Sequence, residues 1–288
     1  MTNIGSAAEG TQAEPGAADK PLAALYDTAL LDLDGVVYRG PDGVPHAVDS
    51  LLAAAAAGMR LTYVTNNASR TPEAVAQHLV DLGLPAKPEE VVTAAQAVAR
   101  LIAEQVGKGA RVLTLGGEGL RVALQGYGLE LVASADDDPA AVVQGYVPDT
   151  SWKDLAEAAY AVERGVPWFA ANTDSTMPTA RGIAPGNGAL VGAVAAATGT
   201  WPTVAGKPEP ALHRETMIRT NARRPLVVGD RLDTDIEGAN RAGVDSLLVL
   251  TGVTTLEHVR GAPDLHQPTY VAPDLRGLLD PSQLIDRR

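Results

Sequence analysis

The sequence has 288 residues, of which 45% are hydrophobic, so the chain can bury the core of one large domain or two medium ones. Its 35 acidic residues outnumber its 23 lysines and arginines, and the formal net charge of -12 argues against a nucleic acid partner, which needs a basic face. The absence of cysteine excludes disulfides, thiolate metal sites and thiol nucleophiles. Any metal must therefore bind oxygen or histidine.

The first twenty residues are rich in Ala, Gly, Glu, Thr and Pro and lack apolar periodicity, which predicts a disordered tail at 1–20. They have neither the positive start nor the apolar centre of a signal peptide. The apolar runs, such as 51–58, are shorter than the roughly 20 residues that span a bilayer. We therefore expect a cytoplasmic protein with no membrane partner.

Short apolar strands alternate with Ala-rich helices along the rest of the chain. The helix predicted at 71–83 has Pro72 in its first turn and Gly83 at its end. Repeated strand and helix units predict an α/β fold with a mostly parallel sheet covered on both faces. The predicted strands are 26–34, 61–66, 111–117, 141–146, 167–173, 224–230 and 246–252.

Polar clusters follow four of the apolar runs, at 32–34, 65–67, 206–207 and 229–235. Because ligands bind outside the carboxyl ends of parallel strands, we expect these clusters to meet at one edge. The long gap between the second and third clusters has its own strands and helices, which predicts an inserted α/β domain serving as a lid. The expected division is a core at 21–93 and 200–288 with an insert at 94–199.

Asp32 and Asp34 stand one residue apart directly behind an apolar run. An EF-hand loop that began at Asp32 would have Val36, Val37 and Gly43 at its fifth, sixth and twelfth positions, so the pattern is not a calcium loop. A plain turn at the strand end remains an alternative for this pair alone. Two anions so close together repel each other, and neither can enter an apolar core without a partner.

A second acidic group follows the strand predicted at 224–230. Asp233 or Thr234 is expected to cap the helix that follows, but Asp230 stands at the strand end, as Asp32 does. Oxygen ligands that come from two strand ends suit Mg²⁺, which retains several waters. A divalent cation would offset the repulsion at Asp32 and Asp34. The histidines show no pair at metal-ligand spacing, so zinc is not expected.

Two further clusters offer hydroxyl, amide and ammonium donors. Thr65, Asn66 and Asn67 follow a strand and precede a helix, where hydroxyl and backbone N–H groups bind anions well. Lys207 lies between a glycine and Pro208, which is expected in the first turn of a helix. Taken singly, these segments are equally compatible with a surface turn and a solvated lysine.

Taken together and in this order, the motifs resemble those of the haloacid dehalogenase-like (HAD) phosphatase superfamily. The resembling segments are DLDGV at 32–36, TNN at 65–67, GKP at 206–208 and GDRLDTD at 229–235, and the pattern extends from about residue 26 to the end. The chain looks like the NagD-like, p-nitrophenyl phosphatase branch, which carries a type C2 α/β cap. Within this branch it is most similar to glycerol 3-phosphate and phosphoglycolate phosphatases, through TNNASR, VVTAAQ, PTARGIAPGNGALV and VVGDRLDTDIEGAN.

The resemblance implies a catalytic role for both acids of the first motif. Asp32 would be the nucleophile that accepts the phosphoryl group, and Asp34 the acid and base that protonates the leaving alcohol and then activates water. Asp32, the backbone carbonyl of Asp34 and Asp230 would hold Mg²⁺. Asp235 would orient the metal's waters or the lysine, and Asp233 would either join it around the metal or only cap the helix.

The resemblance also implies which residues contact the substrate. Thr65, Asn66, Asn67 and Lys207 would bind the phosphoryl oxygens. In the insert, a strand runs into a Pro- and Gly-rich loop and then a helix near Asn187, and the cap residues Asn172, Asp174 and Arg181 are candidates for substrate selectivity. A solvated loop with an exposed Arg181 is the alternative.

The expected substrate is a small phosphorylated metabolite. Glycerol 3-phosphate is the first candidate, followed by 2-phosphoglycolate, with pyridoxal phosphate, nucleotides and sugar phosphates behind. A homodimer through the cap is a further expectation. The alternatives from other classes are a phosphoacceptor signalling domain of the receiver type and a catalytically silent binding protein, because a fold alone does not establish function.

Overall fold

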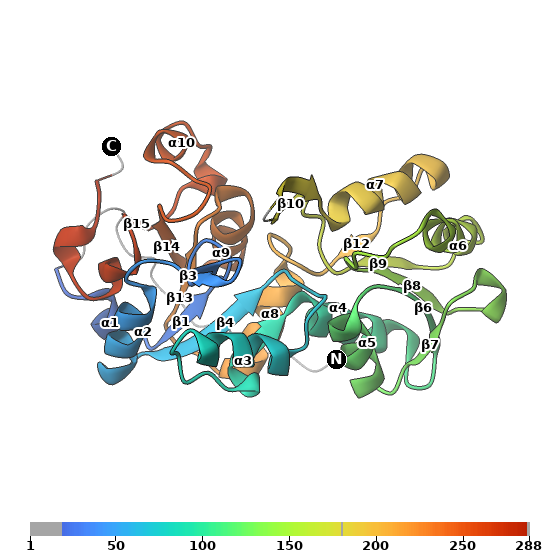
Figure 1. Ribbon diagram of the computed structural model, residues 1–288, viewed down its shortest axis with the longest axis horizontal. Helices are drawn as coiled ribbons and strands as arrows, with labels where there is room; N and C mark the ends of the chain where they lie inside the picture. Colours follow the sequence, from blue (N-terminus) through green and yellow to red (C-terminus); the bar gives the residue numbers. More distant parts are fainter. Residues whose placement is uncertain (1–18, 180, 287–288) are drawn as a thin grey trace, which may run out of the picture. The chain divides into compact units, whose positions relative to one another are not determined.

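The computed structural model describes residues 19–179 and 181–286, so most of the expected tail at 1–20 lies outside the described residues (Figure 1). The described chain divides into two compact units. The first unit contains residues up to 63, residues 82–84 and residues from 217 onward, and the second contains residues 64–81 and 85–216. The division into a core and an insert at residues 93 and 199 stays a prediction.

A six-stranded sheet has the order β15-β14-β13-β1-β4-β5. Strand β1 pairs in parallel with β13 on one side and β4 on the other, and all four of its residues are buried. Figure 1 shows this blue strand beside a strand from the C-terminal half of the chain. The strands are β1 (Thr28–Leu31), β4 (Arg60–Thr65), β5 (Val91–Thr93), β13 (Pro225–Gly229), β14 (Asp245–Val249) and β15 (Tyr270–Ala272).

A second sheet of five strands has the order β12-β9-β8-β6-β7, and its neighbouring strands pair in parallel. Its strands are β6 (Arg111–Leu115), β7 (Glu130–Val132), β8 (Ala141–Gln144), β9 (Trp168–Ala170) and β12 (Thr203–Val204). Two antiparallel hairpins add β2 (Tyr38–Arg39) with β3 (Asp42–Gly43), and β10 (Thr176–Thr179) with β11 (Gly182–Pro185).

Ten α-helices are assigned within the described residues. They are α1 (Leu22–Leu25), α2 (Ala47–Ala56), α3 (Pro72–Asp81), α4 (Ala94–Val106), α5 (Glu118–Gly126), α6 (Trp152–Glu163), α7 (Asn187–Thr198), α8 (Pro210–Thr220), α9 (Glu237–Ala242) and α10 (Leu256–Arg260). None of them is long and apolar enough to cross a membrane. The α/β class with mostly parallel sheets is confirmed, and every strand predicted from the apolar runs is present.

Three local predictions are wrong. The segment expected as a loop before Asn187 is the β10–β11 hairpin. Neither Asp233 nor Thr234 caps a helix, because the chain enters α9 through the single turn η3 (Leu232–Ile236), and neither element has a side-chain cap. The helix after Lys207 begins at Pro210 rather than at Pro208.

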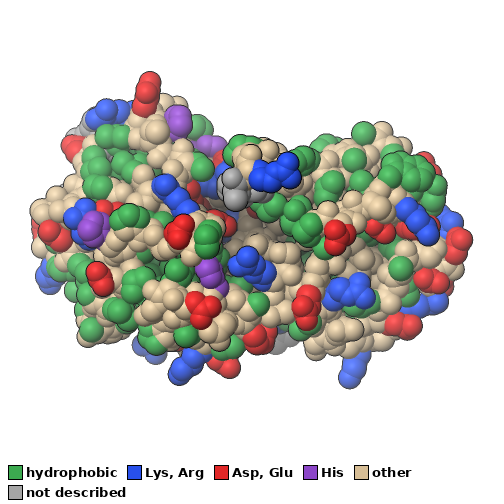
Figure 2. Space-filling view, in the orientation of Figure 1, with side chains coloured by type: hydrophobic (Ala, Val, Ile, Leu, Met, Phe, Trp, Pro, Cys, Tyr) green, Lys and Arg blue, Asp and Glu red, His purple; other side chains and the backbone are tan. Residues whose placement is uncertain are grey.

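Each unit has its own apolar core among the described residues. In the second unit, β6, β8 and β9 pack against α6 and α7 through residues such as Val142, Trp168 and Val191. In the first unit, Leu248 and Val271 pack with Ile236 and Val259. On the face in Figure 2, Lys and Arg side chains stand apart among acidic ones and form no continuous basic surface.

Asp274 provides a pH-dependent contribution to the stability of the first unit. It caps the short turn η5 (Leu275–Leu278), and its carboxylate accepts hydrogen bonds from Arg276 N at 2.9 Å and Arg276 Nη2 at 2.7 Å. The Arg276 side chain lowers the pKa of Asp274 below its ordinary value of 3.8. The unfolded chain therefore binds this proton more readily, and the stabilisation present above the unfolded pKa is lost as the pH falls through the folded one.

We expect Asp274→Asn to lower the free energy of unfolding by about 1 kcal/mol at pH 7, because asparagine keeps the cap but not the charge. The difference from the wild type should shrink below about pH 4. Urea unfolding at pH 7, 5 and 3 measures it. A difference that stays constant over this range would contradict the prediction.

Candidate active site

Asp32 lies where the buried strand β1 ends. Its backbone N–H donates to Val228 O at 2.8 Å, so the strand pairing with β13 continues as far as this residue. Asp32 itself is half-buried. The neighbouring strand β13 ends at Gly229, and Asp230 follows it directly. Two adjacent parallel strands thus deliver one carboxylate each to the same edge of the sheet.

Asp230 is buried, and glycines make room for its carboxylate. Its Oδ2 accepts a hydrogen bond from Val253 N at 2.9 Å. A Cβ atom at Gly252 would lie 1.8 Å from this oxygen, and one at Gly35 would lie 2.7 Å from it. Gly35 also has a φ of +83°, a backbone angle that residues with a side chain rarely adopt. The DG and TG dipeptides therefore shape the surroundings of Asp230.

Asp235 comes from η3, the turn that follows β13. It is buried, and its Oδ2 accepts a hydrogen bond from Arg231 N at 3.2 Å. A Cβ atom at Gly229 would lie 2.2 Å from Asp235 Cβ, so this glycine is needed for the approach. Asp233 is exposed instead and pairs with Arg231 Nη2 at 2.8 Å. The structure thus places Asp235 inward and Asp233 outward.

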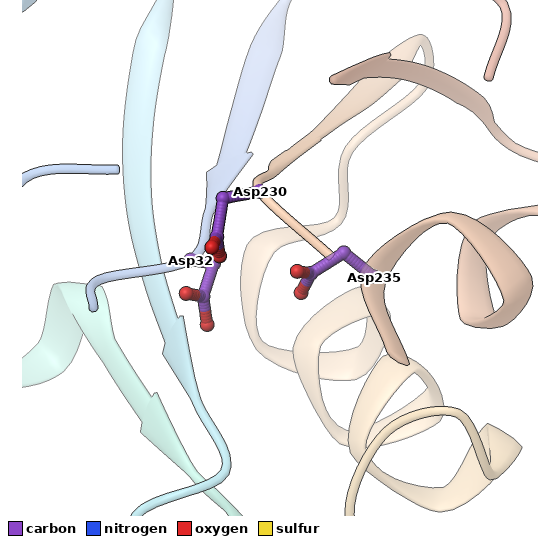
Figure 3. A group of neighbouring side chains, drawn as sticks. All are labelled: Asp32, Asp230 and Asp235. Carbon is purple, nitrogen blue, oxygen red and sulfur yellow. The ribbon is translucent and has the colours of Figure 1, made fainter. Parts of the chain in front are cut away.

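The carboxylates of Asp32, Asp230 and Asp235 form one cluster. One oxygen of each lies within 4.8 Å of the others, and Figure 3 shows the three side chains directed toward a common space. Unit charges at this spacing repel by about 3 kcal/mol per pair at an effective dielectric constant of 20. A hard divalent cation removes that repulsion and prefers such oxygen donors, so the donor set fits Mg²⁺.

Asp34 lies in the turn after Asp32 and contributes no carboxylate to this cluster. The turn is held at Leu33 O, which accepts hydrogen bonds from Val37 N at 2.9 Å and Tyr38 N at 3.1 Å. Asp34 is exposed, while Gly35 O accepts a hydrogen bond from Thr251 Oγ1 at 2.6 Å. A fixed backbone with an accessible carboxylate suits a group that exchanges protons.

Thr65 and Asn67 lie at the end of β4, in the second unit. Thr65 is buried, and its Oγ1 accepts a hydrogen bond from Asn67 N at 3.1 Å, which leaves its own proton as a donor. Asn67 is exposed, and its Oδ1 accepts from Ser69 N at 2.8 Å and Ser69 Oγ at 2.7 Å. The side chain of Asn67 is thus engaged in a local turn.

Asn66 and Lys207 lie together in the second unit. The Asn66 side chain accepts from Lys207 N at 2.8 Å and donates to Lys207 O at 3.1 Å. Lys207 is 4% exposed, and its Nζ donates to Val64 O at 3.4 Å. Lysine side chains are almost never fully buried unless they are paired, so the burial of Lys207 indicates a specific role.

The selectivity candidates are placed differently from one another. Asn172 is buried and its Nδ2 donates to Asn66 O at 2.7 Å, so it holds the second unit together internally. Asp174 is half-buried and accepts from Asn66 Nδ2 at 3.2 Å. Arg181 is exposed at the turn of the β10–β11 hairpin. The side chains of Asn172 and Asp174 both bond to Asn66, one to its backbone oxygen and the other to its side-chain amide.

Val253 and Gly252, which hold and accommodate Asp230, are functional residues that were not predicted from the sequence. The signal was the TG dipeptide behind an apolar run, the same pattern as DG at 34–35. Asn187, whose Nδ2 donates to Asn172 O at 2.7 Å, was not predicted as a functional residue either. No sequence signal marks this contact, because it joins segments through a buried side chain.

Comparison with protein families gives two matches. The model described as haloacid dehalogenase-like hydrolase matches residues 29–130, and the one described as HAD-hydrolase-like matches residues 204–278. Among characterised proteins, the chain is 50% identical over 266 residues to D-glycerol 3-phosphate phosphatase of Mycobacterium tuberculosis, covering 92% of this chain and 74% of that protein. It is 39% identical to an acid sugar phosphatase of Staphylococcus aureus, over 87% and 95% of the two chains.

Solved structures give the same picture. The glycerol phosphate phosphatase of Mycobacterium tuberculosis in complex with magnesium superimposes with a TM-score of 0.88 at 50% identity, covering 91% of this chain and 79% of that one. A p-nitrophenyl phosphatase from Archaeoglobus fulgidus superimposes with a TM-score of 0.81 at 31% identity, over 88% and 98% of the chains. The resemblance read from the motifs is confirmed.

Proposed function

The chain belongs to the haloacid dehalogenase-like hydrolases and is a phosphoric monoester hydrolase, and we propose that it hydrolyses glycerol 3-phosphate through an aspartyl-phosphate intermediate. The cluster of Asp32, Asp230 and Asp235 carries the proposal for the reaction. The 50% identity to D-glycerol 3-phosphate phosphatase supports the substrate. Sugar phosphates are the second candidate class, because a relative named acid sugar phosphatase is 39% identical.

Mg²⁺ is the cofactor that fits this cluster. Asp32, Asp230 and the backbone carbonyl of Asp34 are the proposed ligands, and the position of Asp235 within the cluster adds it to the candidates. When bound, the ion neutralises charge on the phosphoryl group and on the acids around it. The solved relative that contains magnesium supports this assignment.

Asp32 is the proposed nucleophile and Asp34 the proposed acid and base. A carboxylate oxygen of Asp32 forms a bond to phosphorus while the bond from phosphorus to the alcohol oxygen breaks. Asp34 gives its proton to the leaving alcohol and then takes a proton from the water that attacks the phosphoaspartate. The alcohol leaves in the first step, and the second step gives inorganic phosphate, the restored Asp32 carboxylate and the protonated Asp34.

The second unit supplies the groups that we propose donate hydrogen bonds to the phosphate. Thr65 offers a hydroxyl proton, and Lys207 offers an ammonium group on a backbone that Asn66 holds at two points. Asn66 and Asn67 contribute through their backbone N–H groups in this scheme, because their side chains are engaged with Lys207 and Ser69. These donors would bind the equatorial oxygens in the transition state.

Asp174 and Arg181 remain the proposed selectivity residues of the insert, which we propose acts as a cap. The partner is a small phosphorylated metabolite, and a homodimer through the cap and a cytoplasmic location are further proposals from the sequence.

The proposal is tested by phosphate release from about twenty small phosphate esters, with Mg²⁺ and after its removal by EDTA. We expect glycerol 3-phosphate to have the highest kcat/KM, and activity to return when Mg²⁺ is restored. Higher kcat/KM for a sugar phosphate would transfer the substrate assignment to that class. An absence of turnover on every ester would overturn the proposed reaction.

A further inference from the structure

Three buried asparagines in the second unit are connected in series, because the side chain of Asn187 donates to the backbone oxygen of Asn172 and the side chain of Asn172 donates to the backbone oxygen of Asn66. Asn66 is 9% exposed, Asn172 5% and Asn187 2%. They come from separate segments, since Asn66 follows β4, Asn172 follows β9, and Asn187 is the first residue of α7. We call this series the three-amide relay.

The relay ends on the backbone of Lys207. Asn187 Nδ2 donates to Asn172 O at 2.7 Å and to Gln144 O at 3.3 Å. Asn172 Nδ2 donates to Asn66 O at 2.7 Å. Asn66 in turn bonds both the N–H and the C=O of Lys207, at 2.8 Å and 3.1 Å. Two bonds from one amide fix the backbone orientation from which the lysine side chain departs.

Glycines allow the segments of the relay to approach one another. A Cβ atom at Gly206 would lie 2.8 Å from Asn66 Oδ1 and 2.6 Å from Ala171 O. On either side of Asn187, a Cβ atom at Gly186 would lie 2.2 Å from Asp174 O, and one at Gly188 would lie 2.2 Å from Thr173 O. The glycines of the GNG and AGKP segments therefore allow the close approach that the relay needs.

We propose that Asn172 and Asn187 are positioning residues that act on phosphoryl transfer through Lys207. The inference rests on the proposed function, because Lys207 is proposed there to bind the phosphoryl oxygens through its ammonium group. This positioning role takes the place of direct substrate contact by Asn172. Both polar atoms of its side chain are engaged, since Nδ2 donates to Asn66 O and Oδ1 accepts from Asp174 N at 3.2 Å. Losing a buried amide here leaves its partners unsatisfied and loosens the backbone that aims the ammonium.

A purely structural role in the cap would give a different result, and Gln144 provides the matched control. Gln144 is 1% exposed and lies beside Asn187, but only its backbone oxygen receives a relay bond. Its side-chain amide makes no hydrogen bond to the described residues. Gln144→Met therefore removes a buried amide of similar size without cutting the relay.

The test is a double-mutant cycle with Lys207→Met, using p-nitrophenyl phosphate and glycerol 3-phosphate. We expect Asn172→Ala and Asn187→Ala each to lower kcat about tenfold with little change in KM. In the Lys207→Met background, Asn187→Ala should change kcat less than about twofold, because coupled residues are not additive. Gln144→Met should leave kcat within about twofold. Equal losses in both backgrounds, or an equal loss in Gln144→Met, would overturn the proposal.

Hydrogen exchange of the Lys207 backbone N–H tests the relay independently of turnover. We expect Asn187→Ala to accelerate this exchange at least about tenfold, while Gln144→Met leaves it unchanged. Urea unfolding of each variant identifies global destabilisation. If Asn187→Ala does not fold, Asn187→Ser, which keeps a small polar group, takes its place in both experiments. Unchanged exchange would overturn the relay even if the protein is an active phosphatase. Accelerated exchange in a protein that hydrolyses no ester would overturn the proposed function and the catalytic role of the relay, and leave the hydrogen-bond series itself supported.

Discussion

Asp32→Asn should lower kcat for glycerol 3-phosphate at least about 10³-fold, because an amide oxygen is a poor nucleophile toward phosphorus. Asparagine nearly matches the shape of aspartate, so the strand pairing of Asp32 N with Val228 O should persist. One of the three clustered charges is also removed. The variant should therefore be at least as stable as the wild type in the absence of Mg²⁺.

Steady-state phosphate release and urea unfolding measure the two parts of this prediction. Asp49→Asn is the matched control, since Asp49 is exposed in the first turn of α2 in the same unit. It should keep kcat within about twofold and change stability by a few tenths of a kcal/mol at most. Near-normal Mg²⁺-dependent activity in Asp32→Asn would refute the assignment of the nucleophile.

The part of the site that could be predicted from sequence is the part that strand ends carry. Asp32 and Asp230 each follow an apolar run, and the carboxyl ends of neighbouring parallel strands necessarily share an edge. The same reasoning predicts the polar end of β4 at Thr65. The short strands β5, β15 and β12 could not be predicted in this way, because three residues in β5 and β15 and two in β12 are too few to show a period.

The direction of a side chain could not be predicted from spacing alone. Asp233 and Asp235 are separated by one residue, but the turn η3 sends Asp233 to Arg231 at the surface and Asp235 into the acidic cluster. Likewise Asn172, which the sequence offers as a contact for substrate, donates inward to Asn66. Such choices depend on hydrogen bonds between segments distant in the chain, which no local pattern records.

Gly252→Ala should weaken Mg²⁺ binding about 10-fold to 100-fold, the usual effect of disturbing groups that orient a metal ligand. A Cβ atom at residue 252 would lie 1.8 Å from Asp230 Oδ2, so either the carboxylate or the segment that carries Val253 N must move. Both movements break the bond that orients Asp230. The Mg²⁺ concentration for half-maximal activity should rise by the same factor.

Calorimetric titration with Mg²⁺ alone separates the loss of metal from a loss of substrate binding. Gly261→Ala is the matched control, because its Cβ atom would meet nothing nearer than Glu257 O at 3.7 Å. If Gly252→Ala kept the wild-type Mg²⁺ affinity, Asp230 would not be a ligand whose orientation matters. Because saturating Mg²⁺ compensates for a weaker site, kcat at high Mg²⁺ should recover in Gly252→Ala, whereas no concentration of Mg²⁺ should rescue Asp32→Asn. That difference separates the residue that orients a metal ligand from the residue that forms the bond to phosphorus.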